Sequence, residues 1–230
     1  MKTISTLLAA GILLAAVASG SAQTSFTKIT TGAIVNDLGS YTRCSWGDFN
    51  NDGFLDLFVS NYEGRTNVFY RNNGNGTFTK ITLGDPVQDA DYHTGAAAAD
   101  YDNDGHLDLL VSAGVGAPTA RRNLLYHNNG DRTFSRVSGG SVTNQLGFFN
   151  ACSWADYDND GFLDLFVTDS GASSGTGGTN LLFHNNGDGT FAKVISGTVP
   201  SGVGNGDGGL WADYDSDGFM DLIVVNYINP

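Results

Sequence analysis

Short apolar runs, separated by polar and glycine-rich stretches, recur along most of the chain. Two examples are Leu107–Val111 and Leu163–Val167, and each follows a cluster of aspartates. Runs of this length that contain β-branched residues and are bounded by turn residues are typical of strands rather than helices. The pattern therefore predicts an all-β chain.

Two independent sequence marks recur with the same spacing. An aspartate-rich loop begins at Asp48, Asp100, Asp156 and Asp213, so its copies are 52, 56 and 57 residues apart. A Phe-x-Lys/Arg-Ile/Val segment begins at Phe26, Phe78, Phe134 and Phe191, with the same three spacings. Two marks that repeat in register indicate four copies of one unit, at about residues 26–77, 78–133, 134–190 and 191–230.

Each complete unit is predicted to hold four antiparallel strands. One strand enters the aspartate loop and a second leaves it, while a third and a fourth flank an Asn-Asn-Gly turn at residues 72–74, 128–130 or 185–187. Four-stranded sheets that repeat at about 50 residues are typical of β-propeller blades, which stack because no blade can bury its own faces. A linear solenoid of the same units is the alternative. Because the fourth unit stops after its second strand, we expect about three and a half blades.

The first 22 residues have the features of a secretory signal peptide. Met1 and Lys2 give a basic start, Leu7–Val17 is an apolar run, and small residues lead to Ala22. The run is too short for the alternative, a transmembrane anchor, and no second apolar stretch of that length follows. We therefore predict cleavage after Ala22 and a mature chain, residues 23–230, that is secreted or held at the cell surface, with the periplasm as another destination.

The charge balance excludes one class of partner. The chain has 24 acidic and 11 basic residues, a formal net charge of -13. Nucleic-acid binders carry basic faces, so we expect no nucleic-acid partner. All the acids except Glu63 are aspartates, and aspartate favours turns and metal loops over helices.

The four aspartate loops carry the clearest chemistry. Each offers side-chain oxygens at positions 1, 3, 5 and 9, glycine at position 6 and a backbone carbonyl at position 7, which is a donor set that suits Ca²⁺ better than Mg²⁺. The predicted ligands are Asp48, Asn50, Asp52, Phe54 and Asp56 in loop 1; Asp100, Asp102, Asp104, His106 and Asp108 in loop 2; Asp156, Asp158, Asp160, Phe162 and Asp164 in loop 3; and Asp213, Asp215, Asp217, Phe219 and Asp221 in loop 4. Position 12 is valine in every copy, where an EF-hand needs glutamate.

Electrostatic repulsion favours a bound cation over bare turns. Two carboxylates ~5 Å apart at an effective dielectric constant of ~20 repel by roughly 3 kcal/mol, and a loop with four aspartates contains several such pairs. The alternative is that the loops are only Asp/Asn/Gly turns with solvated acids. We predict up to four structural Ca²⁺ ions.

These loops, the following Leu-Asp-Leu-Phe-Val strands and the segment Asn123–Asp131 together resemble the FG-GAP or VCBS repeats of bacterial exported proteins, in particular the ASPIC/UnbV type. The resemblance covers nearly the whole mature chain. It implies a seven-bladed propeller like that of integrin α-subunits, with Ca²⁺ in the loop between the first two strands of a blade. Asn50 departs from the aspartate expected there, and the missing blades imply a fragment of a longer chain or assembly with further copies.

Five other residues have structural interpretations. Cys44 and Cys152 occupy equivalent positions two units apart, too far apart for a disulfide, so we expect two buried and inert thiols. Trp46, Trp154 and Trp211 each precede a loop by two residues. We expect them to pack between blades; a sugar-binding platform is the alternative.

Two classes of function remain open. The segments between the second and third strands, residues 61–66, 113–122 and 169–179, vary while the sheet residues repeat, and loops on a rigid scaffold are the usual binding sites. We therefore expect an extracellular binding or adhesion module for a protein or carbohydrate ligand. The alternative is a propeller portion of an extracellular polysaccharide-degrading enzyme, for which His93 is the only candidate base outside the repeat.

Overall fold

The computed structural model describes residues 27–172, 177–201 and 203–227. The chain divides into two compact units, Met1–Thr30 and Thr31–Pro230, and the description that follows concerns the second. The predicted signal peptide and Phe26 lie outside the described residues.

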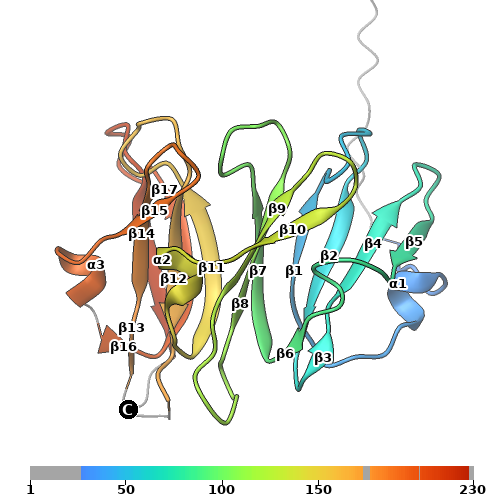
Figure 1. The fold of residues 1–230 in the computed structure, drawn as a ribbon, viewed down its shortest axis with the longest axis horizontal. Coiled ribbons are helices and arrows are strands. Elements are labelled where there is room, and N and C mark those ends of the chain that lie inside the picture. The colour runs from blue at the N-terminus through green and yellow to red at the C-terminus, as the bar shows by residue number, and fades with distance from the viewer. Residues whose placement is uncertain (1–26, 173–176, 202, 228–230) are drawn as a thin grey trace, which may run out of the picture. The chain divides into compact units, whose positions relative to one another are not determined.

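Four antiparallel sheets account for most of the second unit, as the repeats predict. Sheet 1 has the strand order β1 (Tyr41–Gly47), β2 (Asp56–Asn61), β4 (Val68–Asn72) and β5 (Phe78–Ile81); sheet 2 has β7 (His93–Ala99), β8 (Asp108–Ala113), β9 (Leu124–Asn128) and β10 (Phe134–Val137); sheet 3 has β11 (Phe149–Ala155), β12 (Asp164–Asp169), β14 (Leu181–Asn185) and β15 (Phe191–Lys193); and sheet 4 has only β17 (Gly206–Ala212) and β18 (Asp221–Asn226). In Figure 1, sheet 1 lies at the right in blue to cyan and sheet 2 in the middle in green, while sheets 3 and 4 overlap at the left in yellow to red. The predicted all-β fold of four-stranded sheets is confirmed.

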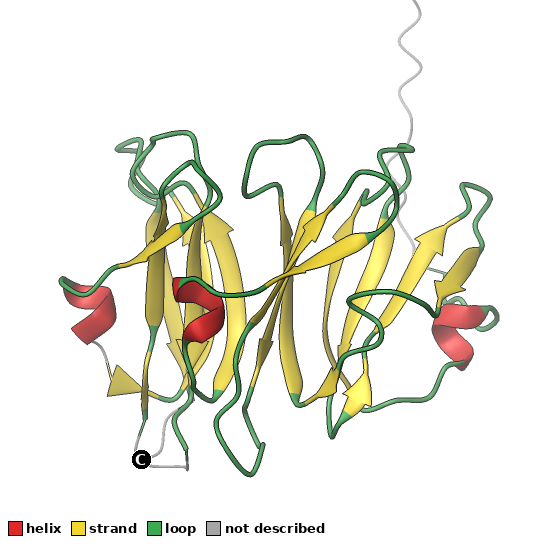
Figure 2. Cartoon of the chain, in the orientation of Figure 1, coloured by secondary structure: helices red, strands yellow, loops and turns green. Residues whose placement is uncertain are grey.

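Short elements connect the sheets. Strand β3 (Arg65–Thr66) pairs with β6 (Ala90–Asp91), and β13 (Gly178–Thr179) pairs with β16 (Val203–Gly204). The structure also has three one-turn helices that the sequence patterns did not predict: α1 (Ala33–Asn36), α2 (Ser141–Asn144) and α3 (Thr198–Ser201). Helices α2 and α3 follow the fourth strands of sheets 2 and 3, and α1 lies before the first strand of sheet 1. They are the only helices in the described part of the chain (Figure 2), and none is long or apolar enough to cross a membrane.

Strand β8 explains why the apolar runs do not alternate with polar residues. Leu109 and Val111 pack with Phe58 on the side of sheet 1, whereas Leu110 packs with Phe149 on the side of sheet 3. A strand that is covered on both faces needs apolar side chains on both. The second strands of sheets 1 to 3 are therefore buried in the core.

Apolar clusters fill the spaces between neighbouring sheets. Between sheets 1 and 2 the buried members are Phe49, Phe58, Leu109, Val111, Leu124 and Tyr126, and between sheets 2 and 3 they are Tyr101, Leu110, Leu125, Val142, Phe149, Leu165, Val167, Leu181 and Phe183. Val142 comes from α2, so this helix closes the outer rim between sheets 2 and 3. A third cluster, formed by Leu57, Val68 and Tyr70 of sheet 1, packs against Ala33 and Ile34 of α1.

Two of the three tryptophans pack between sheets, as predicted. The indole N–H of Trp154 donates to the Ala97 carbonyl of sheet 2 over 3.3 Å, and that of Trp211 donates to Ser153 Oγ of sheet 3 over 3.1 Å. Trp46 holds the same position in sheet 1 and is 51% exposed. The side of sheet 1 that it occupies is therefore not covered by a sheet among the described residues.

Sheet 4 has the complementary exposed face. Ile223 of β18 is 59% exposed, whereas Phe58, Leu110 and Phe166, which hold the same register position in sheets 1 to 3, are fully buried. Its neighbours Leu210 and Val225 are exposed as well. The surface that the next sheet covers in sheets 1 to 3 is thus open in sheet 4.

The cysteines agree only in part with their interpretation. Neither is in a disulfide. Burial raises the pKa of the Cys152 thiol to about 12, so this thiol is unreactive at neutral pH. Cys44 is exposed, and the prediction of a buried thiol is wrong there, because Cys44 lies on the first strand of a sheet whose preceding neighbour is absent from the described residues.

His93 begins β7 and is fully buried. It occupies the position that Phe149 holds in sheet 3, and neither of its ring nitrogens has a hydrogen-bond partner in the described chain. Burial lowers its pKa to about 4, while Asp91 and Asp89 act in the opposite direction. A fully buried imidazole cannot meet a substrate, which argues against the role of a general base.

Acid should destabilise the fold through His93. Its pKa falls from the ordinary 6.5 to about 4 on folding, so the unfolded chain binds a proton that the folded chain does not. Its contribution is therefore fully present above about pH 6.5 and is lost as the pH falls toward 4. We expect the native chain to lose ~1–3 kcal/mol more than His93→Phe or His93→Gln over this range, as measured by urea unfolding. Parallel stability curves for the three proteins would contradict this.

Candidate metal sites

Each aspartate loop is held by its own backbone. The first aspartate accepts two N–H bonds: in loop 2, Asp100 Oδ1 accepts from Asp104 N over 3.0 Å and Oδ2 from Gly105 N over 2.9 Å. The other three loops repeat both bonds at distances of 2.7–3.0 Å. Position 4 adopts positive φ in every loop, at Asn51, Asn103, Asn159 and Ser216, as does the glycine at position 6. The loop sequence therefore folds each copy in the same way.

The last aspartate of each loop begins the following strand. Asp108 is fully buried and accepts from Tyr101 N over 3.2 Å and from Asn128 N over 2.7 Å, so one carboxylate joins the loop to the third strand. Asp164 does the same in sheet 3 with Tyr157 and Asn185. This carboxylate is thus fixed from two sides before any ligand is present.

The predicted ligands converge in three of the four loops. Groups of three carboxylate or imidazole atoms lie within 4.8 Å of one another, and they come from Asp100, Asp102 and Asp104; from Asp102, Asp108 and His127; from Asp156, Asp158 and Asp164; from Asp158, Asp160 and His184; and from Asp213, Asp215 and Asp221. In loop 1 the Asn50 amide N–H donates to Asp52 Oδ2 over 3.0 Å, so its nitrogen faces that carboxylate. The carbonyls of position 7, at Phe54, His106, Phe162 and Phe219, remain a prediction.

Two histidines lie against the loops, and we did not assign them there from the sequence. His127 Nδ1 lies 3.1 Å from Asp102 Oδ2 and 3.3 Å from Asp108 Oδ1, and His184 stands in the same relation to Asp158 and Asp164. Their repeat equivalence was the available signal, but nothing local to the third strand shows that this position faces the loop. In sheet 1 the position holds Arg71.

Burial makes the loop carboxylates harder to ionise. It raises the pKa of Asp108 to about 7 and that of Asp164 to about 6, and it also raises the pKa of Asp56. Backbone N–H donors oppose the effect, and neighbouring carboxylates add to it. A bound cation would favour the charged form of all of them.

Several buried polar atoms in these sites make no hydrogen bond to the described residues. They are Asp102 Oδ1 and the Nδ1 atoms of His127 and His184, which lie beside carboxylates without a hydrogen bond to them. Buried polar groups are normally paired, and clustered carboxylates with orphaned atoms are a donor set that fits a hard divalent cation. Loops 2 and 3 fit best, loop 4 follows, and loop 1 offers one charge fewer.

Amide side chains tie each loop to the next one. The position 4 asparagines donate to position 6 carbonyls in the following sheet, namely Asn51 to Gly105 over 3.0 Å, Asn103 to Gly161 over 3.1 Å and Asn159 to Gly218 over 2.7 Å. In the reverse direction, Asn128 Nδ2 donates to the Phe49 carbonyl and Asn185 Nδ2 to the Tyr101 carbonyl. The loops therefore form a continuous row along one edge of the four sheets.

The variable segments lie at the opposite edge, because each connects the far ends of a second and a third antiparallel strand. There a cavity of about 370 Å³ opens between the segments of sheets 2 and 3 and the ends of sheet 4. Phe148 and the exposed Tyr227 line it, together with Asn150, Asn205 and Asp207. Aromatic faces beside amide and carboxylate groups can bind a polar ligand.

Comparison with known proteins identifies the repeat. A family model described as the FG-GAP-like repeat matches residues 48–111, 114–167 and 170–224. The first match begins at loop 1 and ends in β8, after loop 2, whereas the second and third each contain one aspartate loop and end in the strand that follows it, β12 or β18.

Relatives exist among animal proteins. The chain is 28% identical over 185 residues to cartilage acidic protein 1 of Mus musculus and to that of Homo sapiens, and 28% identical over 183 residues to that of Xenopus tropicalis. These alignments cover 77–78% of this chain but only 27–28% of the relatives.

The three hydrogen bonds from the position 4 asparagines to the following sheets, which we call the amide row, should contribute to stability. Asn103→Gly keeps a residue that accepts positive φ but removes the bond to Gly161, so we expect the free energy of unfolding to fall by ~0.5–1.5 kcal/mol. Ser216→Gly is the matched control, since Ser216 holds the same loop position and φ and makes no side-chain hydrogen bond within the described residues. Urea unfolding measures both. Equal effects of the two substitutions would show that backbone conformation, not the amide, matters.

Proposed function

The chain belongs to the FG-GAP-like repeat family, and from that premise we propose that it is an exported β-propeller module that Ca²⁺ stiffens and that binds an extracellular ligand. The observation that supports this is the contrast between the two edges of the stack. One edge repeats the same acidic loop four times, and the other carries segments that differ from sheet to sheet. The first suits a constant structural role and the second a specific one.

In this proposal the cations hold the loop edge together. Bound Ca²⁺ would supply positive charge to carboxylates that otherwise repel one another. Asp100, Asp102, Asp104 and Asp108, with the position 7 carbonyl, would hold it in loop 2, and the equivalent residues would do so in the other loops. His127 and His184 lie close enough to orient or join these ligands. Because amides connect the loops, order in one loop would support its neighbours.

The variable edge would provide recognition. The cavity beside Tyr227 lies between the variable segments of sheets 2 and 3 and the ends of sheet 4. Its mixture of aromatic and amide groups suits a carbohydrate or a polar protein surface. The name of the animal relatives, cartilage acidic protein 1, is compatible with a matrix environment. Since the alignment covers only 28% of the mouse protein, the activity of the whole relative is not transferred to this chain.

The proposal includes further blades. The exposed faces of Trp46 and Ile223 are equivalent to surfaces that pack between sheets elsewhere in the chain, so each would accept another blade. That blade would come from a longer chain or from a second copy. The native mass of the exported protein decides between these two sources.

Calcium should raise the melting temperature. At 100 times its dissociation constant, one ion stabilises by about 2.7 kcal/mol, so we expect a rise of at least ~5 °C between chelator and millimolar Ca²⁺. Asp102→Asn, which copies the asparagine of loop 1, should reduce the rise. Asp131→Asn, which removes an exposed charge outside the loops and copies Asn75, should not. Identical melting in both buffers contradicts the proposed metal role.

Ligand binding should map to the variable edge. A panel of glycans and matrix proteins, with and without chelator, should show binding that Tyr227→Ala weakens at least ~10-fold. Tyr214→Ala is the matched control, because Tyr214 is equally exposed but lies in loop 4. Release of reducing sugar from a polysaccharide would instead support the enzyme alternative.

A further inference from the structure

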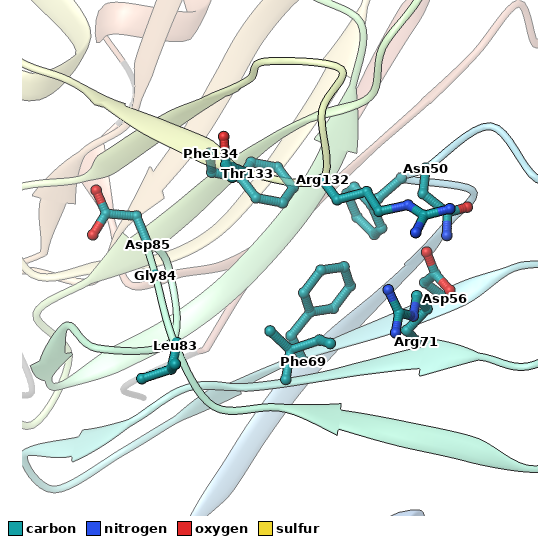
Figure 3. Close-up of a pocket in the computed structure, with 12 residues that line it drawn as sticks. Asn50, Asp56, Phe69, Arg71, Leu83, Gly84, Asp85, Arg132, Thr133 and Phe134 are labelled. Carbon is teal, nitrogen blue, oxygen red and sulfur yellow. The ribbon is translucent and has the colours of Figure 1, made fainter.

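A small apolar pocket lies at the junction of sheets 1 and 2, beside loop 1 (Figure 3). Phe49, Phe69 and Phe134 line its apolar side, and Leu83 stands at its edge, largely exposed. Its volume is about 100 Å³, on the order of the space that admits one benzene-sized group. The pocket can therefore hold a single ring or a short aliphatic chain.

Two guanidinium groups lie at one end of this pocket. Figure 3 shows the side chains of Arg71 and Arg132 extending toward the end where Asn50 and Asp56 lie. Neither guanidinium makes a hydrogen bond or an ion pair to any residue that the structure describes, whereas Arg43, Arg121 and Arg136 each pair with an aspartate. Both charges are thus available to a ligand.

Arg132 stands in an unfavourable backbone position. Its φ is 73°, and the equivalent residues of the other two turns are glycines, Gly76 with φ 83° and Gly189 with φ 80°. A residue with a side chain is disfavoured in this region by roughly 1 kcal/mol. Arg71 also differs from its equivalents, which are His127 and His184. Both differences from the repeat therefore occur at the same pocket.

We propose that this pocket binds a carboxylate that carries one small apolar group. The apolar group would lie against the three phenylalanine rings, and the carboxylate would accept hydrogen bonds from Arg71 and Arg132, a strong pairing for a planar anion. Asp56 and Asp85 also line the pocket, which disfavours a doubly charged phosphate. A free aromatic acid and the C-terminal residue of a peptide share this chemistry. The site lies at the loop edge and is separate from the variable edge of the proposed function.

The first test uses small probes in millimolar Ca²⁺. Isothermal titration or NMR should show saturable one-site binding of 3-phenylpropanoate or of N-acetyl-glycyl-phenylalanine, and the tighter of the two identifies a free acid or a peptide C-terminus as the source. The uncharged 3-phenylpropanamide should bind at least ~10-fold more weakly. Absence of saturable binding, or equal binding of acid and amide, would overturn the proposal.

The second test replaces each arginine with the residue that holds the equivalent position in the other repeat units. Arg71→His with Arg132→Gly gives the junction the residues of the other units, and we expect at least ~10-fold weaker binding of 3-phenylpropanoate. Arg132→Gly alone should weaken binding without lowering the melting temperature, since glycine accepts this φ. Arg65→Ser, which removes from β3 an exposed guanidinium that pairs with no described residue, should leave binding unchanged. Unchanged binding in the folded double variant overturns the proposal, while the Ca²⁺ dependence of melting reports separately on the proposed metal role.

Discussion

Hydrogen bonds from the backbone to aspartate carboxylates are the interaction on which the rest of this structure depends. In each loop the first aspartate accepts two N–H groups, and in sheets 1 to 3 the last one reaches the third strand. These bonds bring several negative charges together at short distances, which is costly without a counter-charge. The same bonds that shape the loop thus support the proposal that it binds a cation.

The sheets add a second requirement, which no single repeat can meet. A second strand such as β8 carries apolar side chains on both faces, so it is stable only between two other sheets. Trp154 and Trp211 complete these contacts by donating their indole N–H groups to the sheet before. The stability of the fold therefore depends on contacts between adjacent sheets, as in other repeat proteins.

Much of this was predictable from the sequence, for a definite reason. Strand positions and loop copies follow from local patterns that repeat in register, and the sheets confirm them. The contact of His127 with Asp102 and the burial of His93 depend on which way a strand faces, and no local pattern records that. Cys44 was misjudged because its burial depends on a neighbouring sheet. The one-turn helices were missed because four residues are too few for a helical period to be visible.

The amide row of the loops has a direction. In loops 1 to 3 position 4 donates and position 6 of the following sheet accepts, so the two ends of the described stack are chemically different. A unit duplicated in tandem would arrive with its donor and its acceptor already correctly oriented toward its neighbours. Growth of such an array by gene duplication would then preserve these contacts without new mutations, whereas an inverted or shuffled unit would lose them. Ser216, which holds position 4 in sheet 4, has a hydroxyl in place of the amide.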